Sequence, residues 1–593
     1  MNRISRQATT DFPEGLDRGL WFIPLGGAGE IGMNLNLYGC DGAWLMVDLG
    51  VTFGDDTHPG IDVVMPDPTF IAERREKLAG LIVTHAHEDH VGAVAHLWPR
   101  LKCPVYTTPF AAEFLKLKLK ETGLEDEVPV TVVPLGGQVS IGPFDVTFVS
   151  LTHSIPEPNA LVIRTRHGTL FHTGDWKFDA EPVVGAGTDF AALEALGKED
   201  VLALVGDSTN VFSDGESGSE STVRDNLTKL VGRCTGRVAV ACFASNVARL
   251  DSIARAAMAN NRSVALVGAS LWRIVDTARR TGYLAPEFRF HEAKDAAHLP
   301  RENVLYICTG SQGEGRAALM RIAFDQHQDV ALGPGDTVIF SSRVIPGNEQ
   351  AVHKVQNQLV RMGVELVTWR DEMIHVSGHP ARDELRKMYG LVRPRIAVPV
   401  HGELMHMKAH AKLAEECQVP MSVVAENGQA VRFSADGAEV AGTVWSGRLA
   451  LLDNQVVSFA DPVMKERKRV FHDGAVSVAL VMDAAGNLLD DPLVAIFGVS
   501  DPLAADVQPQ RGAGRGGARR GAGHGAGHGA GHGARHGAGR DWREVIENAV
   551  NRLPKKARCD DVIVEDTVRA AVRKAFVPLD KKPVVKVQIS SVD

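Results

Sequence analysis

Long apolar runs are missing from this chain, since no stretch approaches the roughly 18 apolar residues that a membrane-spanning helix needs. The N-terminal stretch, MNRISRQATTDFPEGLDRGLWF, contains no apolar region of the kind found in a secretory signal peptide. We therefore expect a cytoplasmic chain without a membrane partner.

Cysteine is scarce, and positive charge is not in excess. The seven cysteines are scattered and never form a C-x-x-C pair, which argues against a disulfide framework and against a thiolate zinc site. The formal net charge of -9 gives no global signature of nucleic-acid binding. Any site for a polyanion must therefore be local.

The order of apolar and polar segments indicates several domains. At 593 residues with 44% hydrophobic content, the chain predicts two to four domains. Strand-like runs joined by Gly-rich turns from Trp21 to Thr173 indicate an α/β region with many antiparallel strands. Between about Thr222 and Glu372 strands alternate with helices, as in a parallel sheet wrapped by helices. A strand-like run like those of the first region returns at Arg395–Val400. The second region is therefore interpreted as an insertion into the first.

The run IVTHAHEDHVGA at Ile82–Ala93 places three histidines and two acids within six residues, directly after a strand-like run. We expect these side chains on a loop that precedes a helix starting near Val91. A lone histidine is more often structural, but imidazole and carboxylate at H-x-H-x-D-H spacing suit zinc or a similar dication. The pattern predicts a metal site that includes His85, His87, Asp89 and His90.

Two cations need further ligands, and three residues at the ends of strand-like runs supply them. These residues are His153, Asp175 and His401. Each of them alone is as typical of a surface turn. Together with the histidine-rich run they complete two coordination spheres, which an aspartate can bridge.

Several motifs together resemble one known family. Asp48 in LMVDLG, the H-x-H-x-D-H run and the three later ligands resemble the metallo-β-lactamase signature. GDSTN at Gly206–Asn210, SGH at Ser377–His379 and VHGE at Val400–Glu403 are similar to the β-CASP subgroup, which acts on nucleic acids. The runs PLGGAGEIGMN, HTGDWKFD, CFASN, TGSQGE and SGHP resemble the ribonuclease J family, and the resemblance extends from about Trp21 to Asp593 apart from the Gly/His tract.

The resemblance implies a fold class and domain limits. The expected fold is a metallo-β-lactamase αββα sandwich with an inserted β-CASP parallel α/β domain and a small C-terminal α/β domain. The limits are 1–212 and 373–460 for the two parts of the lactamase domain, 213–372 for the β-CASP domain, and 461–593 for a C-terminal oligomerisation domain. A Gly/His/Arg-rich tract at 508–540 lacks the apolar side chains needed to fold and is interpreted as a linker rather than a second metal site.

The resemblance also assigns roles by position. His85, His87 and His153 are expected to hold one zinc ion, Asp89, His90 and His401 the other, and Asp175 is expected to bridge them. Asp48 is expected to orient a ligand by hydrogen bonding. His379, oriented by Asp207, is expected to protonate the leaving oxygen. Without the resemblance, His379 is equally typical of a turn that enters a helix.

The CFASN run is expected to hold a nucleotide. Phe243 is predicted to stack on a base, and phosphate or sugar contacts are predicted for Ser245, Asn246, Ser377 and His379. The alternative for this run is a helix beginning at Asn246, to which Ser245 supplies the N-cap.

The resemblance therefore implies a ribonuclease with two zinc ions per subunit, with manganese as the alternative metal. Its substrate is single-stranded RNA, degraded 5′-to-3′ with a preference for 5′-monophosphate ends and with endonuclease capacity, in rRNA processing and mRNA decay. A homodimer or homotetramer is expected, with RNA-decay proteins as partners. Two alternatives stay open from the residues alone: a small-molecule hydrolase that uses the same metals, and a non-catalytic RNA-binding protein.

Overall fold

The computed structural model describes residues 12–54, 57–434, 436–503 and 541–592, so the predicted tract at 508–540 lies outside the described residues. The chain forms two compact units: one contains the residues up to Phe53 together with Val63–Val456, and the other contains Gly54–Asp62 and the residues from Val457 onward. No helix in the described ranges has the length and apolar character needed to cross a membrane.

Two β-sheets form the centre of the larger unit. The first has the order β25 (Gly437–Thr443), β24 (Gln429–Ser434), β1 (Leu20–Gly26), β3 (Leu35–Cys40), β4 (Ala43–Val47), β7 (Leu78–Ile82), β8 (Val105–Thr107) and β9 (Val130–Val132). The second has the order β10 (Gln138–Ile141), β11 (Phe144–Ser150), β12 (Asn159–Thr165), β13 (Gly168–His172), β14 (Val201–Asp207), β21 (Ile396–Val400) and β23 (Met421–Ser422).

Alternation along the strands explains how the sheets are covered. Leu20 and Phe22 of β1 pack with Phe148 of the second sheet, whereas Trp21 and Ile23 face the opposite way, into the core beneath the helices. The first sheet is covered by α3 (Val94–Leu101) and α4 (Pro109–Thr122), and the second by α5 (Phe190–Leu196), α12 (Arg382–Val392) and α13 (Leu404–Glu416). The predicted αββα sandwich is confirmed.

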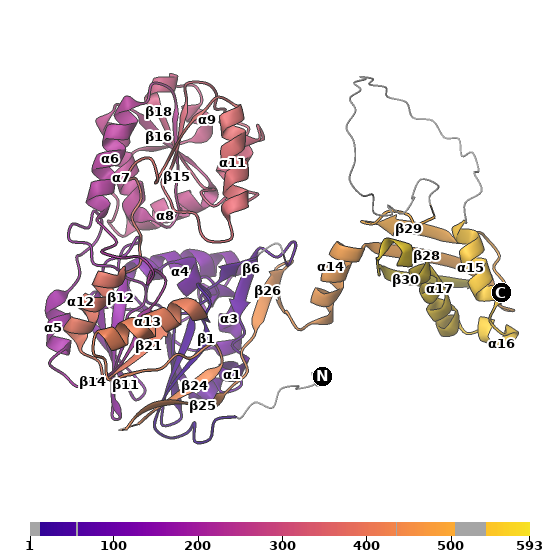
Figure 1. Ribbon diagram of the computed structural model, residues 1–593, viewed down its shortest axis with the longest axis horizontal. Coiled ribbons are helices and arrows are strands. Elements are labelled where there is room, and N and C mark those ends of the chain that lie inside the picture. Colours follow the sequence, from indigo (N-terminus) through magenta and orange to yellow (C-terminus); the bar gives the residue numbers. More distant parts are fainter. Residues whose placement is uncertain (1–11, 55–56, 435, 504–540, 593) are drawn as a thin grey trace, which may run out of the picture. The chain divides into compact units, whose positions relative to one another are not determined.

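The predicted insertion separates two neighbouring strands. β14 and β21 pair in parallel, and the chain between them forms a six-stranded sheet in which all neighbours are parallel. Its order is β17 (Phe290–Glu292), β16 (Ser263–Val267), β18 (Val304–Cys308), β15 (Val238–Ala241), β19 (Thr337–Phe340) and β20 (Glu365–Thr368). Figure 1 shows α6 (Glu220–Arg233) and α7 (Val247–Ala259) on one side of this sheet and α11 (Glu349–Arg361) on the other.

A buried ion pair fixes the start of α7. The Arg249 guanidinium donates to the Glu220 carboxylate of α6 at 2.6 and 3.0 Å. It also donates to the carbonyls of Ser341 and Ile374, at 2.5 and 3.2 Å. Breaking a buried pair leaves an uncompensated charge, so these contacts resist separation. Through them Arg249 holds the CFASN turn against the segment that leads to Ser377.

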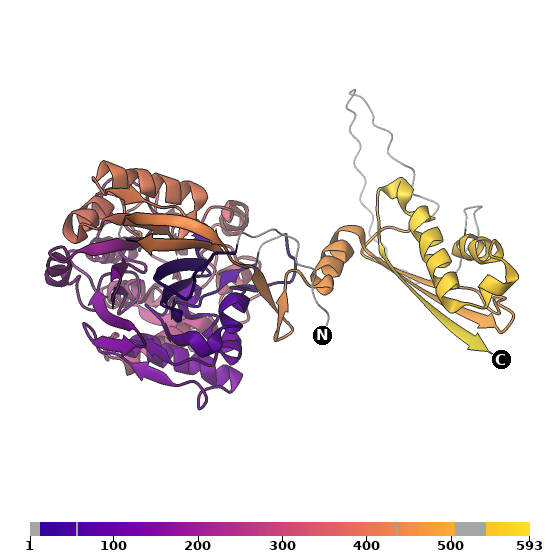
Figure 2. The same cartoon turned by 90° about the horizontal axis from the view of Figure 1, so that it is seen from below.

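The smaller unit is an α/β layer pair. β28 (Ala475–Asp483) lies between β29 (Leu493–Phe497) and β30 (Val584–Val592). Alternate residues of β28, such as Val476 and Val478, pack against α15 (Trp542–Asn551) and α17 (Asp561–Ala575). Figure 2 shows the helices, in yellow, on one side of this sheet. The predicted small C-terminal α/β fold is confirmed.

Candidate metal centre

The residues predicted to bind metal follow the carboxyl ends of strands in both sheets of the sandwich. The H-x-H-x-D-H run follows β7, His153 follows β11, Asp175 follows β13 and His401 follows β21. Since β13, β14 and β21 run parallel, their carboxyl ends meet at one edge. The fold therefore brings together residues that are far apart in the sequence, such as Asp89 and His401, which are separated by 312 positions.

One detail of this run was predicted wrongly. Asp89 and His90 lie not on a loop but in a one-turn helix, α2 (Glu88–Val91), which ends where the predicted helix was to start. The His87 carbonyl accepts hydrogen bonds from the backbone N–H groups of His90 and Val91, both at 3.0 Å. Two acids in the first turn favour this helix through its dipole, a signal that the sequence carried.

Three histidines form the first group of ligand atoms. His87 Nδ1 lies 3.0 Å from His85 Nε2 and 3.0 Å from His153 Nε2. In a tetrahedral zinc site with bonds of about 2.0–2.1 Å, nitrogen ligands lie about 3.3 Å apart. The donor set and its spacing therefore fit one dication, and Asp175 completes the group.

Asp89, His90 and His401 form the second group, again with Asp175. Asp175 Oδ2 lies 3.2 Å from His90 Nε2 and 3.9 Å from His153 Nε2, and His401 Nε2 lies 3.2 Å from Asp89 Oδ2. One carboxylate thus reaches both groups, as the bridging role requires. Imidazole and carboxylate are ligands that suit zinc and manganese alike, so the donor set does not select between them.

Hydrogen bonds behind the ligands fix which ring nitrogen faces the cluster. The Asp48 carboxylate accepts from His90 Nδ1 at 2.7 Å, the contact expected of Asp48. The Thr84 hydroxyl donates to Asp48 at 2.9 Å, so its contact with His85 Nδ1 at 3.0 Å requires a hydrogen on that nitrogen. Nε2 of both rings is thereby left as a lone-pair donor toward the cluster.

The electrostatics divide the cluster into two parts. Burial among other imidazoles lowers the pKa of His85 and His153, and burial lowers the pKa of His87 to about 4, which favours the neutral form in which an imidazole can bind a cation. Burial alone would lower the pKa of His90 as well, but Asp175, Asp89 and Asp48 together raise it. A concentration of buried carboxylates that attracts protons is a place where a cation is stabilised.

The predicted catalytic pair lies beside this cluster. His379 Nδ1 is 2.7 Å from Asp207 Oδ2 and 3.9 Å from Asp175 Oδ2. Its ring stacks on that of His401 with centroids 5.5 Å apart, and its side chain is 23% exposed. Burial opposes protonation of His379, but the Asp207 carboxylate raises its pKa. With Nδ1 committed to Asp207, Nε2 is the nitrogen available to a substrate.

The residues predicted to contact RNA differ in their exposure and in their hydrogen-bond partners. Phe243 and Ser245 are partly exposed in the turn before α7, and the Ser377 hydroxyl accepts from the His379 backbone N–H at 3.1 Å. The N-cap of α7 is Asn246, whose Oδ1 accepts from the Arg249 N–H at 2.8 Å. The alternative of a Ser245 cap is therefore wrong, because the helix begins one residue later than expected.

Asn34 was missed in the sequence. It lies in the PLGGAGEIGMN run, and its Nδ2 is 3.0 Å from the Asp89 carbonyl and 3.1 Å from His90 Nε2. The run was noted only for its resemblance. An amide directly before a strand carries no spacing signal of its own.

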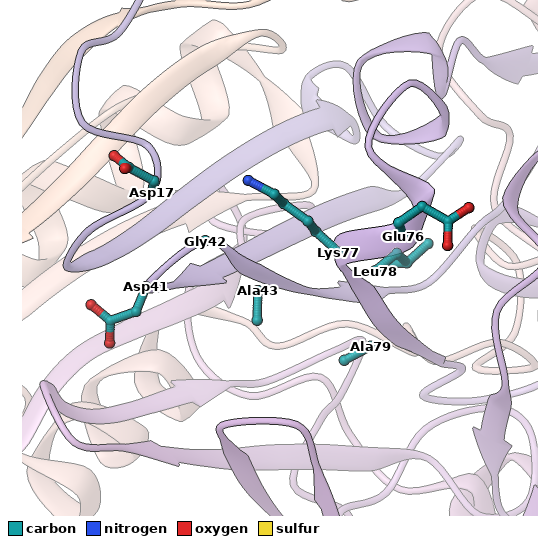
Figure 3. Close-up of a pocket in the computed structure, with 8 residues that line it drawn as sticks. All are labelled: Asp17, Asp41, Gly42, Ala43, Glu76, Lys77, Leu78 and Ala79. Carbon is teal, nitrogen blue, oxygen red and sulfur yellow. The ribbon is translucent and has the colours of Figure 1, made fainter.

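A separate pocket lies away from the metal centre. A pocket of about 380 Å³ is lined by Asp17, Asp41, Gly42, Ala43, Glu76, Lys77, Leu78 and Ala79 (Figure 3). It lies where β4 and β7 begin, at the opposite end of these strands from the metal centre. Asp41 also neighbours Cys40 and His167, but Arg166 already neutralises it at 2.7 Å, so this group is a poor cation site.

Comparison with known proteins agrees with this fold. Three family models match: a beta-lactamase superfamily domain at residues 56–210, a "Ribonuclease J, beta-CASP domain" at 235–359, and a "Zn-dependent metallo-hydrolase RNA specificity domain" at 366–424. The fold and the site together define a metallo-β-lactamase-type hydrolase with a β-CASP insertion.

Relatives identify the family more closely. Ribonuclease J of Sinorhizobium meliloti is 42% identical over 97% of this chain and 98% of its own length. Ribonuclease J 1 of Streptococcus pyogenes is 37% identical over 77% of this chain and 82% of its own. Ribonuclease J of Helicobacter pylori strain J99 is 35% identical, over 78% and 67%. The chain belongs to the ribonuclease J family.

Proposed function

We propose that this metal-dependent ribonuclease degrades single-stranded RNA from the 5′ end, favours a 5′-monophosphate, and also cuts internally. Family membership and the matched RNA-specificity domain support RNA hydrolysis. The observation that carries the proposal is the pair of ligand groups that share Asp175, with the His379–Asp207 pair 3.9 Å from that carboxylate. A small-molecule hydrolase needs neither the insertion nor this pair.

The ligands proposed to hold two cations are His85, His87 and His153 for the first, Asp89, His90 and His401 for the second, and Asp175 for both. Two bound dications, zinc or manganese, would supply a nucleophile by acidifying water and would neutralise charge on the phosphate oxygens.

The residues of the chain perform the remaining steps. His379 Nε2 would donate a proton to the leaving 3′-oxygen from the doubly protonated ring, and Asp207, which accepts from Nδ1–H, would stabilise that imidazolium and hold its orientation. Phe243 would stack on a base next to the scissile phosphate. Ser245, Asn246 and Ser377 would position the phosphate and sugar. Arg249 supports this arrangement, because its side chain ties the turn at Asn246 to Ile374, three residues before Ser377.

The end preference is tested with one uniformly labelled RNA that carries either a 5′-monophosphate or a 5′-triphosphate. We expect rapid release of mononucleotides from the monophosphate form, much slower release from the triphosphate form, and no cleavage with a chelator. Equal internal fragmentation of both forms would contradict the exonuclease proposal. Absence of any cleavage with metal present would contradict RNA as the substrate.

We also propose that residues 461–593 join subunits into a homodimer or homotetramer, and that the domain limits 1–212, 213–372 and 373–460 describe the rest. In the smaller unit, Leu493 and Phe497 are 72% and 58% exposed, and both pair with β28 residues that face away from its helices. Exposed apolar side chains on a sheet face are typical of an interface.

The oligomer proposal predicts a change of mass in solution. Light scattering should give a dimer or tetramer for the native chain and a smaller particle when Leu493→Ser and Phe497→Ser are combined. A monomeric native chain would contradict it. RNA-decay proteins as partners, cytoplasmic location, and roles in rRNA processing and mRNA decay belong to the same proposal; the proteins that co-purify with the native chain would test the partners.

A further inference from the structure

The segments through which the chain leaves and re-enters the lactamase domain meet at the metal centre. We call Asp207–Ser213 the exit segment and Ser377–Arg382 the return segment. Besides the contact between Asp207 and His379, the Arg382 N–H donates to the Ser213 carbonyl at 3.0 Å. The Asn210 amide lies 3.4 Å from the His379 carbonyl. The two segments therefore form one hydrogen-bonded unit.

Thr209 of the exit segment contacts a predicted ligand. Its hydroxyl lies 2.9 Å from the His401 carbonyl oxygen and 2.6 Å from His401 Nδ1. A carbonyl can only accept, so the single hydroxyl hydrogen goes to it, and the hydroxyl oxygen must accept from Nδ1–H. This contact leaves His401 Nε2, which faces Asp89, unprotonated and free to bind a cation.

The return segment contacts a ligand of the other group. The Gly378 carbonyl accepts from His153 Nδ1 at 2.5 Å, which leaves His153 Nε2 as the lone-pair donor toward His87. The approach is so close that a Cβ on residue 378 would lie 2.7 Å from His153 Cε1 and 2.8 Å from its Nδ1. Glycine is therefore required here by space, without any need for an unusual backbone conformation.

We propose that Thr209 and the Gly378 carbonyl are positioning groups, one for each cation, and that cation binding is thereby coupled to the exit and return segments of the insertion. This inference rests on the proposed two-cation centre. In the first group, Thr84 of the lactamase domain would orient His85, and Gly378 of the return segment would orient His153. In the second group, Asp48 of the lactamase domain would orient His90, and Thr209 of the exit segment would orient His401. Coupling is reciprocal, so bound cations should order the loop that carries Ser377 and His379.

The test is cation binding, measured without RNA. The metal-free chain is titrated with zinc against a coloured chelator, and the native chain should bind two ions. Thr209→Val, which keeps the shape but removes the hydroxyl, should weaken one ion about 10–100-fold, the usual effect of losing a group that orients a ligand. Thr209→Ser should bind like the native chain. Gly378→Ala should weaken the other ion by a similar factor.

Matched controls separate positioning from loss of fold. Thr228→Val removes a hydroxyl that donates to a helical carbonyl, and Gly390→Ala adds a Cβ where nothing lies within 4 Å. Both should bind two ions normally and melt like the native chain, whereas Thr209→Val and Gly378→Ala should still unfold cooperatively when metal-free, at a somewhat lower temperature. With cobalt in place of zinc, Thr209→Val and Gly378→Ala should change different parts of the visible spectrum.

A second measurement tests the coupling. Amide exchange in the exit and return segments should slow when zinc binds to the native chain, and it should slow less in Thr209→Val. Native affinity for both ions in Thr209→Val and Gly378→Ala, or exchange unaffected by zinc, would overturn the inference while leaving the proposed function intact. A native chain that binds no pair of ions would overturn the metal centre and this inference with it.

Discussion

RNA cleavage by the Asp175→Asn variant is expected to fall by at least about a thousandfold. Asp175 is 3% exposed and belongs to both candidate ligand groups, so its replacement would remove an anionic ligand from both proposed cations at once. Loss of one electrostatic group at a reacting centre costs about 10²–10³ in rate, and loss of one shared by both cations should cost more.

Initial rates of cleavage of a 5′-monophosphate RNA, together with zinc content, measure this effect. RNA binding should stay close to native, because Asp175 is buried and does not belong to the partly exposed CFASN turn. The control is Asp145→Asn, a change of the same kind at an exposed position of β11, which should cleave normally. Retained cleavage by Asp175→Asn would refute the metal assignment.

Many of the proposed metal-binding residues could be predicted from sequence because they follow the ends of strands. His401 stands directly after one apolar run and Asp175 three positions after another, and these runs become the strands β21 and β13. Polar residues at those positions are carried to the sheet edge whatever the rest of the chain does. The insertion was readable for a similar reason, since strand–helix alternation between Thr222 and Glu372 is typical of a parallel sheet.

What the sequence did not predict depends on local competition and on distant contacts. Asn and Ser cap helices about equally well, so the residue types alone did not predict that Asn246 rather than Ser245 caps α7. The contact between Gly378 and His153 joins residues 225 positions apart through a backbone carbonyl, a group that every residue has. No spacing pattern marks such a contact.

His379→Ala is expected to lower the rate of RNA cleavage about 10²–10⁴-fold, the usual contribution of a positioned proton donor. Zinc content should be unchanged, because His379 is not among the residues predicted to bind either zinc ion. The variant His353→Ala, at an exposed position of α11, is the matched control and should cleave normally.

The leaving group distinguishes proton donation by His379 from a general effect on the site. A nucleotide p-nitrophenyl ester releases a stable phenolate that needs no proton, whereas RNA releases a strongly basic 3′-alkoxide. If His379 Nε2 supplies that proton, His379→Ala should hydrolyse the p-nitrophenyl ester at close to the native rate while RNA cleavage stays slow. Equal losses on both substrates would refute the general-acid role and would instead indicate that the ring, stacked on His401 at 5.5 Å, acts by holding that ligand in place.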